Sequence, residues 1–260
     1  MNSKRLSYAY TAALVGLIAI VALARFDLVI GAFEMTLAGF RRGPAAQAHL
    51  IFEIALLAGI LFLTLRAVPM KVAPKRDALI FALAALAGYA AEAWGTQTGL
   101  WTYYTHETPP LWIVPVWPLG ALVIDRMSEY AGQRWKKYLS NETVSFLYWG
   151  AAVSSISVFL LFAGPAETNP RTWLLLVFMA GTFCFRPEPK RDIWIILTGL
   201  FYVFFADIWG TTNNCWTYYH QEGGSALRLL SGVAFGMFFD STLVLGTLKS
   251  ARFFRAGRAE

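Results

Sequence analysis

Two acidic residues each end an apolar stretch and are followed at once by a loop rich in Trp and Tyr. The two groups are Glu92 with Trp94, Trp101, Tyr103 and Tyr104, and Asp207 with Trp209, Trp216, Tyr218 and Tyr219. Burial disfavours the charged form of a carboxyl group, which makes it a proton donor. Aromatic faces stabilise positive charge through their quadrupole. An acid beside such rings is suited to protonating a carbon–carbon double bond.

The two acids belong to an internal repeat with an offset of 115 residues. Residues 74–104 and 189–219 align without a gap over 31 positions, and 13 of these are identical. A register kept this strictly indicates duplication of a structural unit. Parallel repeats are related by an axis along the membrane normal. Glu92 and Asp207 would then share one cavity, with one acid protonated and the other ionised.

Simpler explanations exist for the same residues. Trp and Tyr gather at membrane interfaces, so the loops are also typical of an aromatic belt. The two acids would in that case be solvated near the interface or bonded to a neighbouring Trp, Tyr or Thr. The identical spacing in both copies favours the functional interpretation, because a belt requires only composition. Gly95 and Gly210 are expected to end their helices and let the chain turn back.

Asp125 and Asp240 are a second pair of acids at equivalent positions of the repeat. Asp125 adjoins Arg126, and an ion pair at the membrane interface would explain it. Asp240 has no adjacent base, so a structural role explains it less easily. Both are secondary candidates for the site.

His106 and His220, in the aromatic loops, are further secondary candidates. The chain has three histidines, too few for a histidine-rich di-iron cluster. A single metal held by these two with carboxylates is the alternative to our expectation of no metal. The sequence contains no dinucleotide- or phosphate-binding loop, and we expect no cofactor.

The composition indicates an all-α polytopic membrane protein. Of 260 residues, 57% are hydrophobic and 15% are charged, whereas soluble domains carry about 25% charged residues. The apolar runs reach the length of about 20 residues that a membrane-spanning helix needs. The net charge of +6 forms no basic tract, which argues against nucleic acid as a partner. The expected partners are the bilayer and a hydrophobic substrate.

We predict about eight transmembrane helices in one integral membrane domain, built as two parallel four-helix repeats over residues 1–130 and 131–260. Their predicted ranges are 8–25, 48–67, 78–96, 111–128, 143–163, 171–186, 193–210 and 226–247. The segment 26–47 is expected to be an interfacial helix, or alternatively a re-entrant piece.

The distribution of basic residues predicts the orientation of these helices. With the N-terminus inside, 17 Lys and Arg fall on the cytoplasmic side and five on the other. The positive-inside rule then places both termini in the cytoplasm and the Trp/Tyr loops outside. We expect a multi-pass protein of the plasma (inner) membrane.

The first copy carries a set of residues with a recognisable pattern: Gly88-Tyr89, Glu92, Gly95-Thr96, Thr98-Gly99, Tyr103-Tyr104, Val114-Pro115 and Trp117-Pro118. It resembles the membrane-bound carotenoid hydratase family, in which a Glu and a Gly-Thr-x-Thr-Gly stretch precede a Tyr-containing loop. The second copy, through Asp207, Trp209 and Trp216, is similar to the heterodimer-type lycopene cyclase domain. The resemblance covers about 45 residues per copy. The Pro-x-Glu-Glu motif of the cyclases has no counterpart in either copy.

The resemblance implies cofactor-independent acid chemistry on the terminal alkene of a long isoprenoid. Either Glu92 or Asp207 would protonate a C=C bond, the rings would shield the cation, and hydration or cyclisation would follow. The enzyme would be a carotenoid or terpenoid hydratase or cyclase, that is, a lyase or isomerase. Two alternatives remain: a transporter with paired acids between the repeats, and a non-catalytic subunit of a membrane complex. The sequence leaves substrate and oligomeric state open.

Overall fold

The structure is a computed structural model that describes residues 3–41, 43–221 and 226–256. Within these ranges the chain forms nine α-helices, short 3-10 turns and one pair of short strands. Six of the described helices are long and apolar enough to cross a membrane. The prediction of an all-α polytopic membrane protein is confirmed. The number of eight spans stays a prediction, because α7 has only 15 residues and α5 carries several charges.

The chain divides by its packing into two compact units, Met1–Val72 and Ala73–Glu260. The first unit consists of α1 (Ser3–Ala24), α2 (Phe26–Phe40) and α3 (Pro44–Ala67). Within it, the Ser7 hydroxyl donates to the carbonyl of Pro69 over 2.9 Å and ties α1 to the segment after α3. The segment 26–47 thus contains a helix, α2, whose place at the membrane interface stays a prediction.

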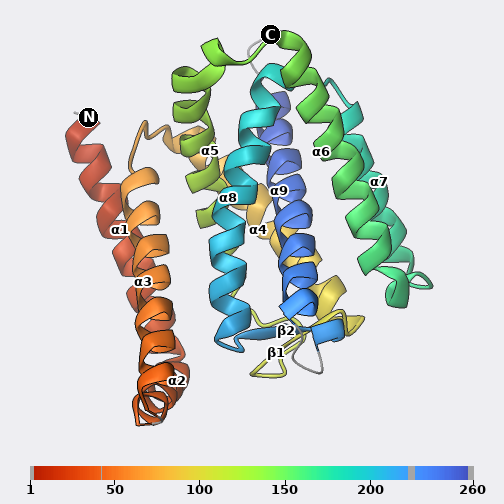
Figure 1. Cartoon of the computed structure of the whole chain (residues 1–260). Helices are drawn as coiled ribbons and strands as arrows, with labels where there is room; N and C mark the ends of the chain where they lie inside the picture. Colours follow the sequence, from red (N-terminus) through yellow and green to blue (C-terminus); the bar gives the residue numbers. More distant parts are fainter. Residues whose placement is uncertain (1–2, 42, 222–225, 257–260) are drawn as a thin grey trace. The chain divides into compact units, whose positions relative to one another are not determined.

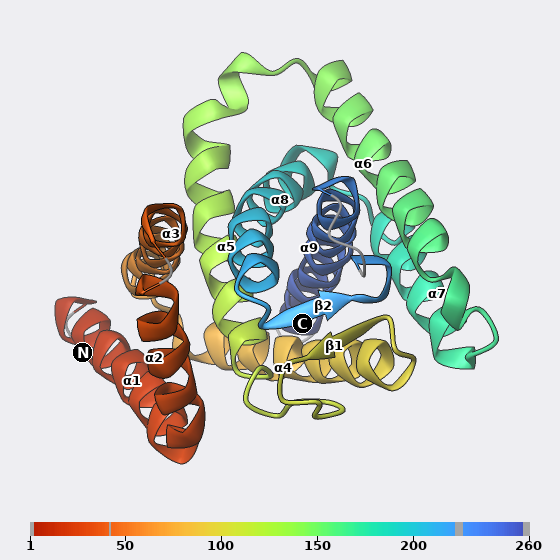
Figure 2. The same cartoon turned by 60° about the horizontal axis from the view of Figure 1, so that its bottom comes forward.

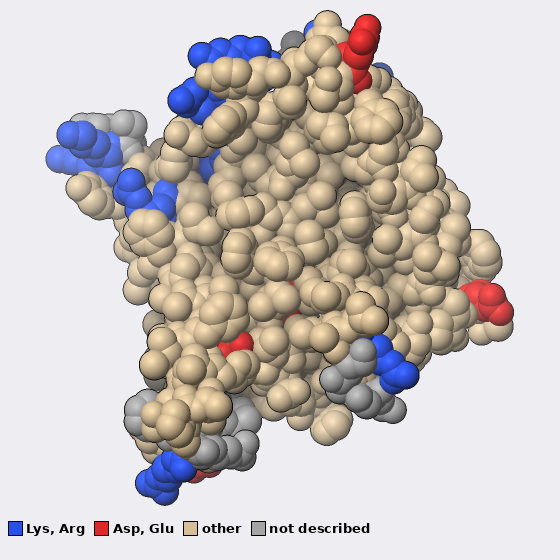
Figure 3. All heavy atoms as spheres, in the orientation of Figure 1, with Lys and Arg blue, Asp and Glu red and all other residues tan. Residues whose placement is uncertain are grey.

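The second unit is built around four helices. These are α4 (Pro74–Gln97), α5 (Val116–Trp135), α8 (Pro189–Thr212) and α9 (Ala226–Ala256), and α6 (Asn141–Phe162) and α7 (Pro170–Cys184) pack against α9. Figure 1 shows the four central helices side by side, with α6 and α7 flanking them. On the face in Figure 3, charged side chains gather near helix ends, and the flanks between them are almost entirely uncharged. Such flanks suit contact with lipid.

The two aromatic loops meet as a two-stranded antiparallel sheet. In it, β1 (Trp101–Tyr103) pairs with β2 (Trp216–Tyr218), and Thr102 lies opposite its own repeat mate Thr217. The sheet lies across the end of the bundle at which α4 and α8 terminate (Figure 2). Helix contacts follow the same symmetry, because α4 packs on α5 and α9 as α8 packs on α9 and α5. The larger repeats, 1–130 and 131–260, stay a prediction.

Gly95 and Gly210 do not end their helices, contrary to the expectation from sequence. The helices continue to Gln97 and Thr212. Two residues beyond these ends, Gly99 and Asn214 adopt left-handed backbone conformations with φ of 71° and 55°. This conformation terminates helices commonly and favours Gly or Asn.

Gly95 and Gly210 instead make room for an indole ring. A Cβ atom on Gly95 would lie 1.9 Å from Cη2 of Trp101, and one on Gly210 would lie 1.8 Å from Cη2 of Trp216. The tryptophan of each loop therefore folds back onto the helix that precedes it. This contact sets where each strand begins.

Two helices extend well past their predicted C-terminal ends. Helix α9 continues to Ala256 rather than 247, and its Lys249 and Arg252 bind the buried Asp192 of α8 over 3.1 and 2.8 Å. Helix α5 begins at Val116, after Pro115 as its N-cap, and ends at Trp135 rather than 128. Because the residues near these ends are charged, the hydropathy pattern predicts a loop there, although the helix continues through them.

We predict that Gly210→Ala destabilises the protein by about 1–3 kcal/mol, the usual cost of overpacking. The added methyl would overlap the Trp216 ring, which would have to shift from its place against α8. Thermal unfolding of the detergent-solubilised protein measures the effect. The control is Gly150→Ala in α6, where a Cβ meets nothing within 4 Å. Equal unfolding temperatures for the two variants would contradict the packing argument.

Candidate functional site

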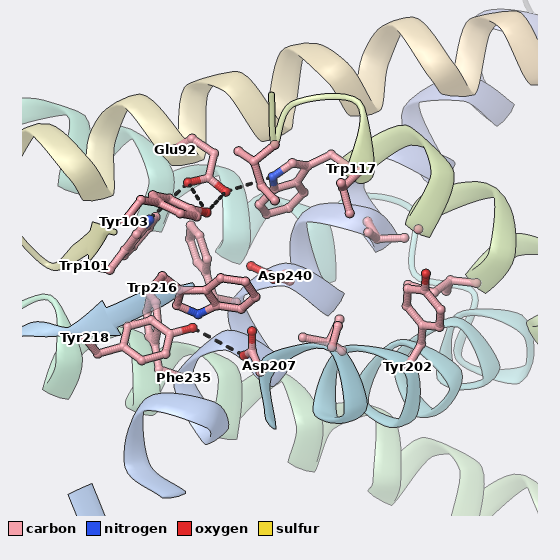
Figure 4. A pocket seen from close by; sticks show the side chains of 18 residues that line it. Glu92, Trp101, Tyr103, Trp117, Tyr202, Asp207, Trp216, Tyr218, Phe235 and Asp240 are labelled. Carbon is pink, nitrogen blue, oxygen red and sulfur yellow. Dashed lines mark hydrogen bonds between the residues drawn. The ribbon is translucent and has the colours of Figure 1, made fainter. Parts of the chain in front are cut away.

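A cavity of about 120 Å³ lies inside the second unit, between α4, α5, α8 and α9 and next to the β1–β2 sheet. Three carboxyl groups line it: Glu92 from α4, Asp207 from α8 and Asp240 from α9. Figure 4 shows Glu92 and Asp207 on opposite walls, with Asp240 between them. Most of the remaining wall is apolar or aromatic. The aromatic lining residues are Trp101, Tyr103, Trp117, Tyr202, Trp216, Tyr218, Phe235 and Phe239.

Glu92 is held by donors from three side chains. The indole N–H of Trp101 donates to Oε2 over 3.1 Å, and the indole N–H of Trp117 donates to Oε1 over 3.1 Å. The Tyr103 hydroxyl lies 3.0 Å from both carboxyl oxygens. An indole N–H can only donate, so this arrangement suits an ionised carboxylate, whose oxygens accept hydrogen bonds.

The strand β1 explains how two of these donors reach the same acid. Alternate residues of a strand point to the same face, so Trp101 and Tyr103 project together while Thr102 projects away. Burial raises the pKa of the Tyr103 phenol well above its ordinary value of 10, and the nearby Glu92 adds to this. Tyr103 therefore remains a neutral O–H donor. Burial raises the pKa of Tyr218 in the same way.

Asp207 occupies the equivalent position but has a much sparser environment. Among the described residues, the side chain that donates to Asp207 is Tyr218, whose hydroxyl lies 3.4 Å from Oδ2. Its carboxyl group lies so close to α9 that a Cβ on Gly236 would be 1.7 Å from Oδ2. No hydrogen-bond donor contacts the Asp240 carboxyl group within the described part of the chain.

The difference between the two acids follows from the sequence of the second copy. The third donor of Glu92, Trp117, is replaced by Gly232 at the equivalent position. Asp207 is also one methylene shorter than Glu92, and its oxygens do not reach the Trp216 indole. One acid thus has a complete set of donors, and the other two face the cavity with few or none.

Several residues predicted for the site lie outside the cavity. Trp94 is fully buried and donates to the Thr172 hydroxyl over 2.9 Å. Trp209, at the equivalent position, is partly buried and is not among the lining residues. Tyr104 and Tyr219 are 41% and 37% exposed and are likewise not part of the lining.

Among the secondary candidates, the structure brings only Asp240 into the cavity. Asp125 makes ion pairs with Arg76 and Arg126 toward the other end of the bundle. His106 lies in the loop after β1 and does not line the cavity. His220 also lies outside it, with Nε2 2.5 Å from the Ser231 hydroxyl, and partial burial lowers the pKa of its imidazole.

Sequence reasoning missed four aromatic residues of the lining: Trp117, Tyr202, Phe235 and Phe239. Phe235 and Phe239 are four residues apart on α9 and stack at 5.0 Å between ring centroids. Residues at this spacing share a helix face, and Asp240 follows directly. An acid directly after such a pair is the sequence signal that could have identified these two residues as part of the site. Apolar pairs at this spacing also occur wherever helices pack, so the signal is not specific.

Comparison with models of protein families, with curated proteins and with solved structures gave no match. Within the described ranges, no group of three His, Cys, Asp or Glu residues is arranged to hold a metal ion. What the cavity does must therefore be argued from its own geometry.

We predict that Tyr103→Phe destabilises the protein by about 1.5–3 kcal/mol, the range for a hydrogen bond to a charged group. The cost should become smaller in a Glu92→Gln background, because the acceptor is then neutral. Thermal unfolding of the four variants of this double-mutant cycle measures the coupling. Tyr219→Phe, which removes a hydroxyl outside the cavity, is the control. The same cost in both backgrounds would show that the hydroxyl does not act on Glu92.

Proposed function

We propose that this chain is an integral membrane enzyme that protonates a terminal C=C bond of a long, carotenoid-like isoprenoid and then hydrates or cyclises it. The observation that carries the proposal is the convergence of Glu92, Asp207 and Asp240 on one aromatic-lined cavity. Carboxyl groups inside membrane-spanning segments are costly and are functional by default. The three acids come from three helices, so their meeting is a property of the fold.

The environments of the acids support different roles. Asp207 is the proton donor in our proposal, because its sparse hydrogen bonding suits the neutral form. Glu92 remains ionised among its three donors and stabilises the developing cation together with the rings around it. Asp240 lies between the two in the cavity wall.

The steps balance without a cofactor. The π electrons of the double bond take the Asp207 proton at the less substituted carbon and leave positive charge on the more substituted, terminal carbon. In hydration, a water oxygen bonds to this carbon and its extra proton returns to the Asp207 carboxylate. In cyclisation, an internal double bond attacks the cation, and the carboxylate removes a proton to form a new double bond.

The cavity volume supports binding of one end of such a substrate. A cavity of about 150 Å³ holds benzene, so the 120 Å³ cavity here holds an isoprenoid end group and not a whole chain. Val116 at its wall is 49% exposed. The rest of the substrate would extend past this residue toward lipid. In this proposal the protein lies in the inner membrane, with its termini cytoplasmic and the Trp/Tyr loops outside.

We expect Asp207→Asn and Glu92→Gln each to lower product formation at least about 100-fold, because a general acid contributes roughly 10²–10⁴-fold. The measurement is chromatography of pigments and lipids from cells that make lycopene and other isoprenoids and express each variant. Glu107→Gln removes a loop carboxyl outside the cavity and should keep wild-type product levels. A new hydroxylated or cyclised product that persists in the Glu92→Gln/Asp207→Asn double variant would refute the mechanism.

A second candidate function is transport. The acids lie where the first copy, α4 and α5, meets the second copy, α8 and α9. Substrate sites of carriers built from repeats lie at such an interface. Proteoliposomes with a pH-sensitive dye inside distinguish the two functions. A proton flux that Asp207→Asn abolishes would favour a carrier, and tight vesicles together with product formation in cells would favour the enzyme.

A further inference from the structure

A second cavity, of about 250 Å³, lies at the end of the bundle away from the β1–β2 sheet. It is bounded by the starts of α4 and α8 and by the later turns of α5 and α9. Six basic side chains line it: Arg76, Lys136, Lys190, Arg191, Arg252 and Arg255. The acids in its lining are Asp125 and Glu129.

Both lining acids are already ion-paired with a lining base. Arg76 makes ion pairs with both Asp125 and Glu129. Lys136, Lys190 and Arg255 contact no acid within the described part of the chain. The cavity therefore keeps an excess of positive charge in its wall.

This excess persists when the surrounding charges are counted. Behind the wall lie two further bases, Arg126 and Lys249, and three acids, Asp77, Asp192 and Glu188. Eight basic groups then face five acidic ones. Because Asp77 is bound by Arg126 and Asp192 by Lys249, these buried acids do not neutralise the lysines of the lining.

Arg252 provides a donor that is already oriented. Its Nη2 donates to Asp192 over 2.8 Å, which holds the guanidinium in place. Its Nη1 is buried and has no hydrogen-bond partner, since the nearest acid, Glu188, lies 3.9 Å away. A buried N–H group without an acceptor is costly. An anion bound in the cavity would supply the missing acceptor.

We propose that this cavity binds a phosphate or diphosphate group. Planar guanidinium groups and lysines together are the usual recognition elements for such anions. The positive-inside rule alone would require basic residues in the loops, whereas here three helices and the 3-10 turn after α5 direct them into one cavity. Anionic lipid headgroups and soluble phosphate esters share this chemistry. The proposal does not depend on what the acid-lined cavity does.

The experiment compares two double variants of the full chain that each remove two positive charges. Lys190→Gln/Arg255→Gln removes bases of the lining that contact no acid among the described residues. Lys75→Gln/Arg134→Gln is the matched control, because Lys75 is the repeat mate of Lys190 and neither control residue lines the cavity. Titration calorimetry with sodium pyrophosphate tests the soluble source. Native mass spectrometry after exchange into mixed phosphatidylglycerol and phosphatidylcholine tests the lipid source.

We expect the cavity variant to bind pyrophosphate, or to retain phosphatidylglycerol, at least about tenfold more weakly than the control. If the cavity variant loses only phosphatidylglycerol, the ligand is a lipid headgroup. If it loses only pyrophosphate binding, the ligand is a soluble phosphate ester. Equal binding by both variants would overturn the proposal, since it would show only general attraction to a basic protein. Failure of the wild type to bind either probe would overturn it as well.

Discussion

The pairing of β1 with β2 is the constraint on which the rest of the second unit depends. Thr102 lies opposite Thr217, its own repeat mate, so the pairing itself is nearly two-fold symmetric. Each strand is tied to its helix by an indole packed on a glycine, Trp101 on Gly95 and Trp216 on Gly210. Three strand residues per copy thereby hold α4 and α8 at a set separation and bring their acids to one cavity.

Within this near-symmetric frame, the two copies differ in the environments of their acids. Glu92 has three donor side chains, and Asp207 has one distant hydroxyl. Two identical carboxylates facing each other in a low-dielectric interior would repel, whereas one ionised and one neutral acid are compatible. Where the first copy has Trp117, the second has Gly232, and this difference leaves Asp207 with one donor fewer than Glu92.

The opposite end of the bundle is organised by charge instead of aromatic packing. Asp77 and Asp192, again repeat mates, are buried there and bind different bases, Arg126 in one copy and Lys249 with Arg252 in the other. A buried ionised carboxylate is tolerated when a base is paired with it. The last turns of α9 carry two of these bases, and the same end of the bundle has a cavity with excess positive charge. The two ends of the bundle thus differ in chemistry.

The sequence by itself determined the membrane class, the approximate positions of the predicted helices and the duplicated acid with its aromatic loop. Composition, the length of apolar segments and the register of the repeat can all be read along the chain without knowing which residues meet. Tertiary structure decided which of these residues meet. It brought Asp240 and Trp117 into the cavity, buried Trp94 against Thr172, and left His106 and His220 outside. Such outcomes depend on helix rotation and strand register, and one residue of slip would turn every side chain of a strand to its other face.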